Sequence, residues 1–214
     1  AWSKRFMVGV VSDGCTGVPA FSRTEVGSNL LSVFSYSRVQ ELACAGIPIV
    51  DIPRVLFQSV TEFIRHLANL VMPSTVHWPY PVKLKDRDGA DSATRFRLDY
   101  LAATLLGFIA DGETLVTFSA GDGIILVNDD LTIIDQDDRP EYPARSIHAP
   151  GSGFQVRTYR MADVRRLAIM TDGPKDLVQD CGFGDEIFAH KRGNVMGLQI
   201  LLNIMFDNYP EKLL

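Results

Sequence analysis

Three short stretches of the sequence run an apolar, strand-like segment directly into an Asp-Gly pair. They are residues 8–14 (VGVVSDG), 118–123 (FSAGDG) and 167–173 (LAIMTDG). A buried strand of this kind delivers a carboxylate to its own end, and the glycine lets the backbone turn sharply beside it. Carboxylates that meet at strand ends form a site for hard cations such as Mg²⁺ or Mn²⁺, which bind oxygen ligands and can present water to a phosphate ester.

An Asp-Gly pair is also a strong hairpin signal, so the simpler interpretation of each pair is a turn. The pairs at Asp13 and Asp172 do not fit a hairpin. Gly14 is followed by a turn that contains Gly and Pro and then by a helical pattern, and Gly173 is followed by Pro174, which can open a helix. The chain is therefore expected to leave the sheet after both carboxylates.

Composition narrows the class of protein. The chain has 214 residues, 46% apolar and 22% charged, which predicts one soluble globular domain with a sizeable core. A net charge of −5 and the absence of a Lys/Arg run argue against nucleic acid as the main partner. No apolar stretch reaches the roughly 18 residues that span a bilayer, so no membrane partner is expected.

Cysteine and histidine usage points to a reducing compartment and away from zinc. The three cysteines are an odd number without a CxxC pair, which fits a cytoplasmic protein: Cys15, Cys44 and Cys181. The four histidines show no HxH or HExxH spacing, so a zinc site is not expected.

Hydrophobic periodicity predicts the elements. A strand over 6–11 precedes a helix with Ser22 as N-cap and Glu25 at N3. Its core-facing side would carry the apolar residues at helical spacing, Val26, Leu30, Val33, Phe34 and Leu42. Pro53 opens a second helix that ends at Pro73. Later come a long loop (74–94), four strands joined as a β-meander (101–109, 114–119, 124–128, 131–134), two further strands (154–160, 166–171) and helical segments (174–178, 185–190, 195–206). The fold class is α+β.

Four of these stretches resemble motifs of the metal-dependent Ser/Thr protein phosphatases, the type 2C or PPM family, and in particular its bacterial members. In the family's order they are Val8 to Gly14, Ala103-Thr104-Leu105, Ala120 to Gly123, and Met170 to Asp176. The resemblance implies an α-β-β-α sandwich of two antiparallel sheets flanked by helices. It also implies a signalling enzyme that hydrolyses phosphoserine or phosphothreonine in proteins with water activated by two metals, so its partner would be a phosphorylated protein.

The same resemblance assigns roles to individual residues. Asp13 would bridge two metals, the Gly14 carbonyl would reach one of them through water, and Asp172 would bind the other; Asp13 and Asp172 are thus the expected catalytic residues. Asp122 and Asp176 would hold a third ion. The implied cofactors are two or three Mg²⁺ or Mn²⁺ ions.

The chain also departs from the family pattern. Cys15 stands where the family usually has His, and Gly121-Asp122-Gly123 replaces Gly-Asp-Ser. The family's first and closing motifs would lie before Ala1 and after Leu214, so we expect residues 1–214 to form a single phosphatase-like domain lacking its first and last strands, with acidic ligands encoded on both sides. Two alternatives stay open: a catalytically weak or inactive phosphatase-like module that acts through partner binding, and an unrelated α+β protein whose Asp-Gly pairs are only turns.

Overall fold

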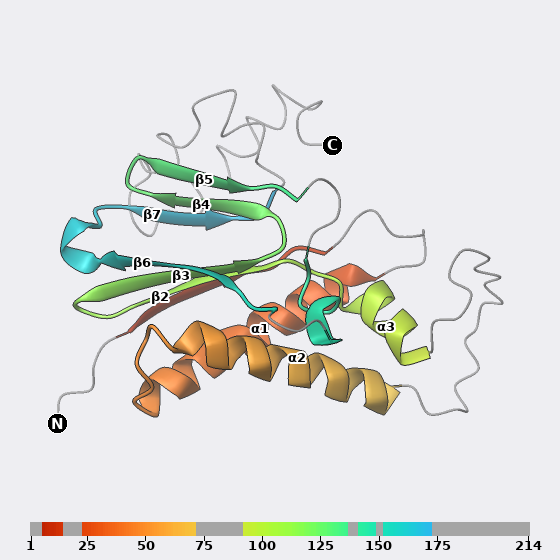
Figure 1. Ribbon diagram of the computed structural model, residues 1–214. Coiled ribbons are helices and arrows are strands. Elements are labelled where there is room, and N and C mark those ends of the chain that lie inside the picture. Colours follow the sequence, from red (N-terminus) through yellow and green to blue (C-terminus); the bar gives the residue numbers. More distant parts are fainter. Residues whose placement is uncertain (1–5, 15–22, 72–91, 137–140, 149–151, 173–214) are drawn as a thin grey trace, which may run out of the picture.

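The computed structural model describes residues 6–14, 23–71, 92–136, 141–148 and 152–172 (Figure 1). Within these ranges seven strands form two antiparallel sheets, and three α-helices pack beside one of them. The expected α+β class with two antiparallel sheets and helices is confirmed. The predicted helical segments after residue 173, the loop over 74–91, and Cys15, Ser22 and Asp176 lie outside the described residues.

The inner strands of both sheets are almost entirely buried. The four-stranded sheet has the order β1-β2-β3-β6 and the three-stranded sheet the order β5-β4-β7. Their bounds are β1 (Met7–Val11), β2 (Leu105–Ala110), β3 (Thr114–Ala120), β6 (Gln155–Arg160), β5 (Asp130–Ile134), β4 (Gly123–Val127) and β7 (Leu167–Met170). All neighbouring strands run antiparallel.

The β-meander prediction is wrong at one connection. β2 pairs with β3 and β4 with β5, but β3 and β4 belong to different sheets. The chain crosses from one sheet to the other at Gly121-Asp122, and the φ angles of Gly121 (86°) and Gly123 (156°) permit this sharp corner. A short connection between two strands therefore joins the two layers of the sandwich here and does not close a hairpin.

Helix α1 (Thr24–Cys44) buries only part of the predicted apolar stripe. Leu42 is buried and Phe34 packs against the core, as predicted. Val26, Leu30 and Val33 are 43%, 40% and 67% exposed. The buried face consists of Thr24, Gly27, Leu31, Ser35, Val39, Leu42 and Ala43. Both sets repeat at helical spacing, and only packing against the sheet selects between them.

The ends of α1 also show how the sequence sets its limits. The helix begins at Thr24 with Arg23 at the N-cap position and without a side-chain cap, so Glu25 is not at N3 as predicted. The Arg23 amide instead donates to the Asp99 carbonyl at 2.8 Å. At the other end Gly46 has a φ of 82°, and the amides of Gly46 and Ile47 donate back to Ala43 and Leu42, as in a Schellman motif.

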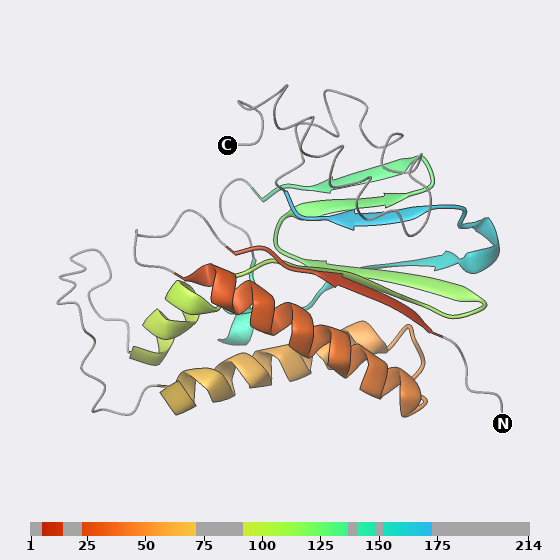
Figure 2. The ribbon, with the colours of Figure 1, turned by 180° about the vertical axis from the view of Figure 1, so that it is seen from behind.

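Helix α2 (Ile52–Val71) lies beside α1 across one face of the four-stranded sheet (Figures 1 and 2). It begins one residue before the predicted Pro53, and Phe63 stacks on Phe34 of α1 with ring centroids 4.1 Å apart.

No helix among the described residues has the length and apolar character needed to cross a bilayer.

Helix α3 (Ser92–Tyr100) was not predicted. The sequence predicts a loop that continues to Thr94 and a strand that begins at Leu101, whereas β2 begins only at Leu105. Phe96 stacks on Tyr100, one helical turn later, with ring centroids 5.0 Å apart. This four-residue spacing of two aromatic residues is the feature of the sequence that indicates the helix.

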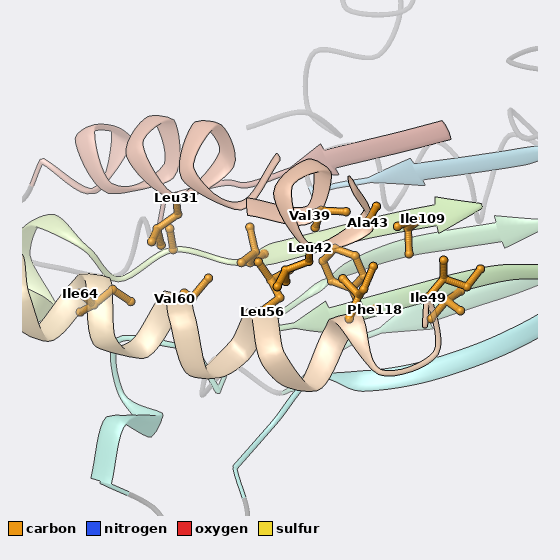
Figure 3. Packing of buried hydrophobic residues seen from close by; sticks show 14 of the residues in the cluster. Leu31, Val39, Leu42, Ala43, Ile49, Leu56, Val60, Ile64, Ile109 and Phe118 are labelled. Carbon is orange, nitrogen blue, oxygen red and sulfur yellow. The ribbon is translucent and has the colours of Figure 1, made fainter. Parts of the chain in front are cut away.

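Two apolar layers hold the structure together. The larger one lies between the helices and the four-stranded sheet and includes Leu31, Leu56, Val60 and Phe118, all fully buried (Figure 3). The smaller one lies between the two sheets and contains Leu106 and Leu115 from one sheet with Ile125 and Val127 from the other. Odd and even positions of β3 therefore face different layers, as the two-residue period of a strand requires.

Candidate active site

Three of the predicted acidic residues follow or precede strands at one end of the sandwich. β1 ends two residues before Asp13, β7 ends two residues before Asp172, and β4 begins directly after Asp122. β1 and β7 end on the same side of the molecule (Figures 1 and 2). β4 pairs antiparallel with β7, matching Ile124 with Met170, so Asp122 and Asp172 both lie two residues beyond that matched pair.

Asp13 is half-buried, and its pKa is raised above the ordinary value for an aspartate. Burial is the largest cause, and the negative charge of Asp172 adds to it. The Gly14 amide opposes both effects by donating a hydrogen bond to Asp13 Oδ1 at 2.8 Å. Asp13 and Asp172, named from the sequence, thus lie within electrostatic reach of each other.

The backbone at Asp13 is held by Thr104, which lies opposite on the extension of β2. The Thr104 amide donates to the Asp13 carbonyl at 2.8 Å, and the Asp13 amide donates to Thr104 Oγ1 at 2.9 Å. Ser12 Oγ donates to the Thr104 carbonyl at 2.5 Å. Sequence reasoning assigns no role to Ser12 or Thr104. The feature of the sequence that could have identified them is that each is a polar residue directly next to an apolar strand, Ser12 after β1 and Thr104 before β2.

Gly14 packs against the start of helix α1. A Cβ atom built on Gly14 would lie 2.6 Å from Thr24 Oγ1 and 2.7 Å from the Thr24 carbonyl carbon. Contact this close leaves no room for a side chain, so the glycine after Asp13 is needed for packing as well as for turning. The first Asp-Gly turn is thereby fixed between the sheet and α1.

Asp122 occupies the corner between the two sheets and is half-buried, with its Oδ1 shielded from solvent. The flanking glycines pack closely: a Cβ on Gly123 would lie 2.8 Å from the Met170 carbonyl oxygen, and one on Gly121 would lie 3.0 Å from Thr104 Cγ2. The Asp122 corner is therefore packed between the end of β7, which leads to Asp172, and Thr104, which is hydrogen-bonded to Asp13.

The described donor atoms fit a hard divalent cation in kind. They are carboxylate oxygens, and a cation near Asp13 and Asp172 would offset the repulsion that raises the Asp13 pKa. Asp172 is exposed and so open to a ligand. Across the described ranges no three His, Cys, Asp or Glu side chains form a group able to hold a metal. Asp176, predicted as a further ligand, lies outside those ranges.

Comparison with solved structures shows the same fold in bacterial phosphatases. A variant of a bacterial serine phosphatase is 15% identical, with a TM-score of 0.59 over 96% of this chain and 81% of its own. The serine/threonine phosphatase Stp1 from Staphylococcus aureus is 15% identical, with a TM-score of 0.52 over 94% and 78%. PppA from Pseudomonas aeruginosa, a regulatory component of T6SS, is 17% identical, with a TM-score of 0.50 over 86% and 73%.

At the level of sequence, no curated protein matches the chain. The sequence profile of one family, described as protein phosphatase 2C, matches residues 1–194. This match includes both Asp13 and Asp172 and extends through all the strands described above. The chain therefore belongs to the protein phosphatase 2C family.

Proposed function

We propose that this protein hydrolyses phosphoserine and phosphothreonine in proteins and requires Mg²⁺ or Mn²⁺ to do so. The observation that carries the proposal is the pair Asp13 and Asp172. Two sheets of a protein phosphatase 2C domain deliver these carboxylates to one end of the sandwich, close enough that one raises the pKa of the other. A like-charged pair of this kind favours a bound cation over two neighbouring anions.

The chain's own residues have distinct roles in this proposal. Asp13 and Asp172 hold the metal ions, with the Gly14 carbonyl contributing through water, and Asp122 and Asp176 hold an accessory ion. Divalent cations in such a site supply an activated water and neutralise the phosphoryl oxygens of the ester. Two or three ions are proposed, and the phosphorylated side chain of a partner protein is the substrate.

The surroundings of Asp13 prepare it for this role. The Gly14 amide fixes one carboxylate oxygen through the bond to Oδ1, which leaves Oδ2 as the oxygen without that constraint. Partial burial limits competing water around the carboxylate and strengthens its interaction with a cation.

The cytoplasmic location inferred from the cysteines stays a prediction.

The test is phosphate release from a phosphoserine or phosphothreonine peptide, measured with Mn²⁺, with Mg²⁺ and with EDTA. Asp13→Asn should abolish release, because it removes the charge and keeps the volume. Asp130→Asn is the matched control, since Asp130 is an exposed aspartate at the first residue of β5, at the other end of β4 from Asp122. A folded protein that binds a phosphoprotein but releases no phosphate with either metal would instead be a phosphatase-like binding module.

A further inference from the structure

The ladder between β1 and β2 changes its hydrogen bonding at the residue that carries the first carboxylate. The register pairs Val11 with Leu106 and resumes at the bridge between Gly14 and Ala103, so Asp13 lies opposite Thr104. In a regular hydrogen-bonded pair of antiparallel strands, the two facing residues exchange both N–H···O=C bonds. Only one of the two is made here, from the Thr104 amide to the Asp13 carbonyl.

Two hydroxyls replace the missing bond. The Asp13 amide donates to Thr104 Oγ1 at 2.9 Å, while the Thr104 carbonyl accepts from Ser12 Oγ at 2.5 Å. The Thr104 hydroxyl in turn lies 3.4 Å from the Asp13 carbonyl, to which it donates. Both backbone polar groups of Asp13 are thus bound to Thr104, and the strand opens at this point without leaving either group unsatisfied.

The other side of Thr104 contacts the corner between the sheets. A Cβ atom on Gly121 would lie 3.0 Å from Thr104 Cγ2 and 3.2 Å from Thr104 Cα. Thr104 is only 5% exposed. It therefore lies between the turn that carries Asp13 and the turn that carries Asp122, with its hydroxyl directed to the first and its methyl group against the second.

We propose that Thr104, assisted by Ser12, is a positioning residue that sets the direction of the Asp13 carboxylate toward the metal ions. The inference rests on the proposed function. Its physical basis is that the carboxylate has only two side-chain torsions, so its position follows the backbone at Asp13, and that backbone is fixed through the Thr104 hydroxyl. Groups that orient a metal ligand from behind commonly change metal affinity by about 10- to 100-fold.

The experiment compares Thr104→Val with Thr104→Ser in the full protein. Valine keeps the shape and removes the hydroxyl, whereas serine keeps the hydroxyl. Thr117→Val is the matched control, because Thr117 Oγ1 is buried in the neighbouring strand and makes no hydrogen bond within the described part of the chain. Three quantities are measured: Mn²⁺ affinity by calorimetry, amide exchange at Asp13 without metal, and thermal unfolding without metal.

We expect Thr104→Val to weaken Mn²⁺ binding about 10-fold or more and to speed exchange of the Asp13 amide, while Thr104→Ser stays close to wild type. Thr117→Val should change neither quantity. Should Thr104→Val fail to fold, Ser12→Ala gives the same test, with Ser35→Ala as its control, because the buried Ser35 Oγ makes no hydrogen bond among the described residues.

Separate results overturn the inference and the proposed function. If wild type binds Mn²⁺ and releases phosphate but Thr104→Val binds Mn²⁺ equally well, the positioning role is wrong and the proposed function stands. If Thr104→Val and Thr117→Val lower the unfolding temperature and the Mn²⁺ affinity alike, Thr104 is a packing residue only. If wild type neither binds Mn²⁺ nor releases phosphate, the proposed function itself fails, and the inference fails with it.

Discussion

Burial raises the pKa of Asp13, and the negative charge of Asp172 adds to this effect although the two residues follow strands of different sheets. In the absence of a cation this arrangement opposes folding, because the Asp13 carboxylate is partly desolvated and because it is repelled by Asp172. Two carboxylates that destabilise the metal-free protein, and whose repulsion a bound cation would remove, are consistent with the metal site proposed here. It also makes the pH dependence of the metal-free protein informative.

Asp13→Asn should stabilise the metal-free protein at pH 7. Because the pKa of Asp13 is higher in the folded than in the unfolded state, ionisation of Asp13 opposes folding. This cost is absent below the unfolded pKa and grows as the pH rises through the folded pKa. The variant's unfolding temperature relative to wild type should therefore be higher at pH 7 than at pH 3, measured by calorimetry in EDTA.

The same variant should lose Mn²⁺-dependent phosphatase activity by at least about 100-fold, as expected when a central charged group of a catalytic site is neutralised. Asp130→Asn serves as the control for both measurements. A metal-free Asp13→Asn protein that is less stable than wild type at pH 7 would contradict the repulsive environment of Asp13.

Asp172→Asn should lower the pKa of Asp13 without restoring its ordinary value. Burial is the largest cause of the shift and persists in the variant, whereas the repulsion from Asp172 disappears. The measurement is a titration of the Asp13 carboxyl carbon by NMR in metal-free protein. An Asp13 that titrates as in wild type would mean that the two carboxylates do not interact in solution.

Asp122→Ala separates an accessory ligand from a turn residue. If Asp122 holds an ion, the Mn²⁺ concentration needed for half-maximal activity should rise several-fold while the fold is kept. The corner should survive the change, since the positive φ angles belong to Gly121 and Gly123. An unchanged Mn²⁺ requirement and an unchanged turnover number would assign Asp122 to the corner alone.

Gly27→Ala should destabilise the protein by about 1–3 kcal/mol, because the added methyl group meets backbone atoms. A Cβ on Gly27 would collide with the Tyr100 carbonyl oxygen and lie 2.7 Å from Leu101 Cα. The sign of the change in unfolding free energy distinguishes the two cases, since an unhindered glycine-to-alanine change within a helix stabilises the protein by about 1 kcal/mol. Gly112→Ala is the control, as a Cβ there has no atom within 4 Å; denaturant unfolding measures both.

Asn128→Gly should destabilise the protein by about 1–3 kcal/mol and leave Mn²⁺ affinity unchanged. Asn128 Oδ1 accepts hydrogen bonds from the amides of Arg165 (2.8 Å) and Arg166 (3.3 Å), and Nδ2 donates to the Asp163 carbonyl at 2.8 Å. Glycine tolerates the φ of 55° at this position, so the loss does not arise from backbone strain in the folded protein. Asn128→Asp, which keeps Oδ1, should lose less in the same unfolding experiment.

Much of the sheet structure was predictable because the strands are short apolar runs between turn residues. β1, β3, β4, β5, β6 and β7 each begin and end within one or two residues of the predicted limits. The change of sheet at Gly121-Asp122 was not predictable, since the same glycine-rich sequence suits a hairpin and a corner between layers. Contacts with distant strands decide whether this sequence forms a hairpin or a corner.

Helix α1 shows the same limit. Val26, Leu30 and Val33 were expected in the core and are exposed, whereas Leu31 and Val39 join the correctly predicted Leu42 there. Periodicity therefore predicts a helix but does not fully determine its buried face. At the site, the strand patterns identify Asp13 and Asp172, and their roles stay predictions. The hydrogen bonds of Thr104 could not be foreseen, because they depend on the register between segments 91 residues apart.

The corner at Gly121-Asp122 has a mechanical consequence for the site. The two sheets are joined there by two residues, whereas the connection from β6 to β7 at the opposite end spans residues 161–166. If one sheet turns against the other, we expect the motion to be smallest near this shortest connection, at Asp122. Asp13 and Asp172 follow strands that end on this side, so we expect their separation to change little although they follow strands of different sheets.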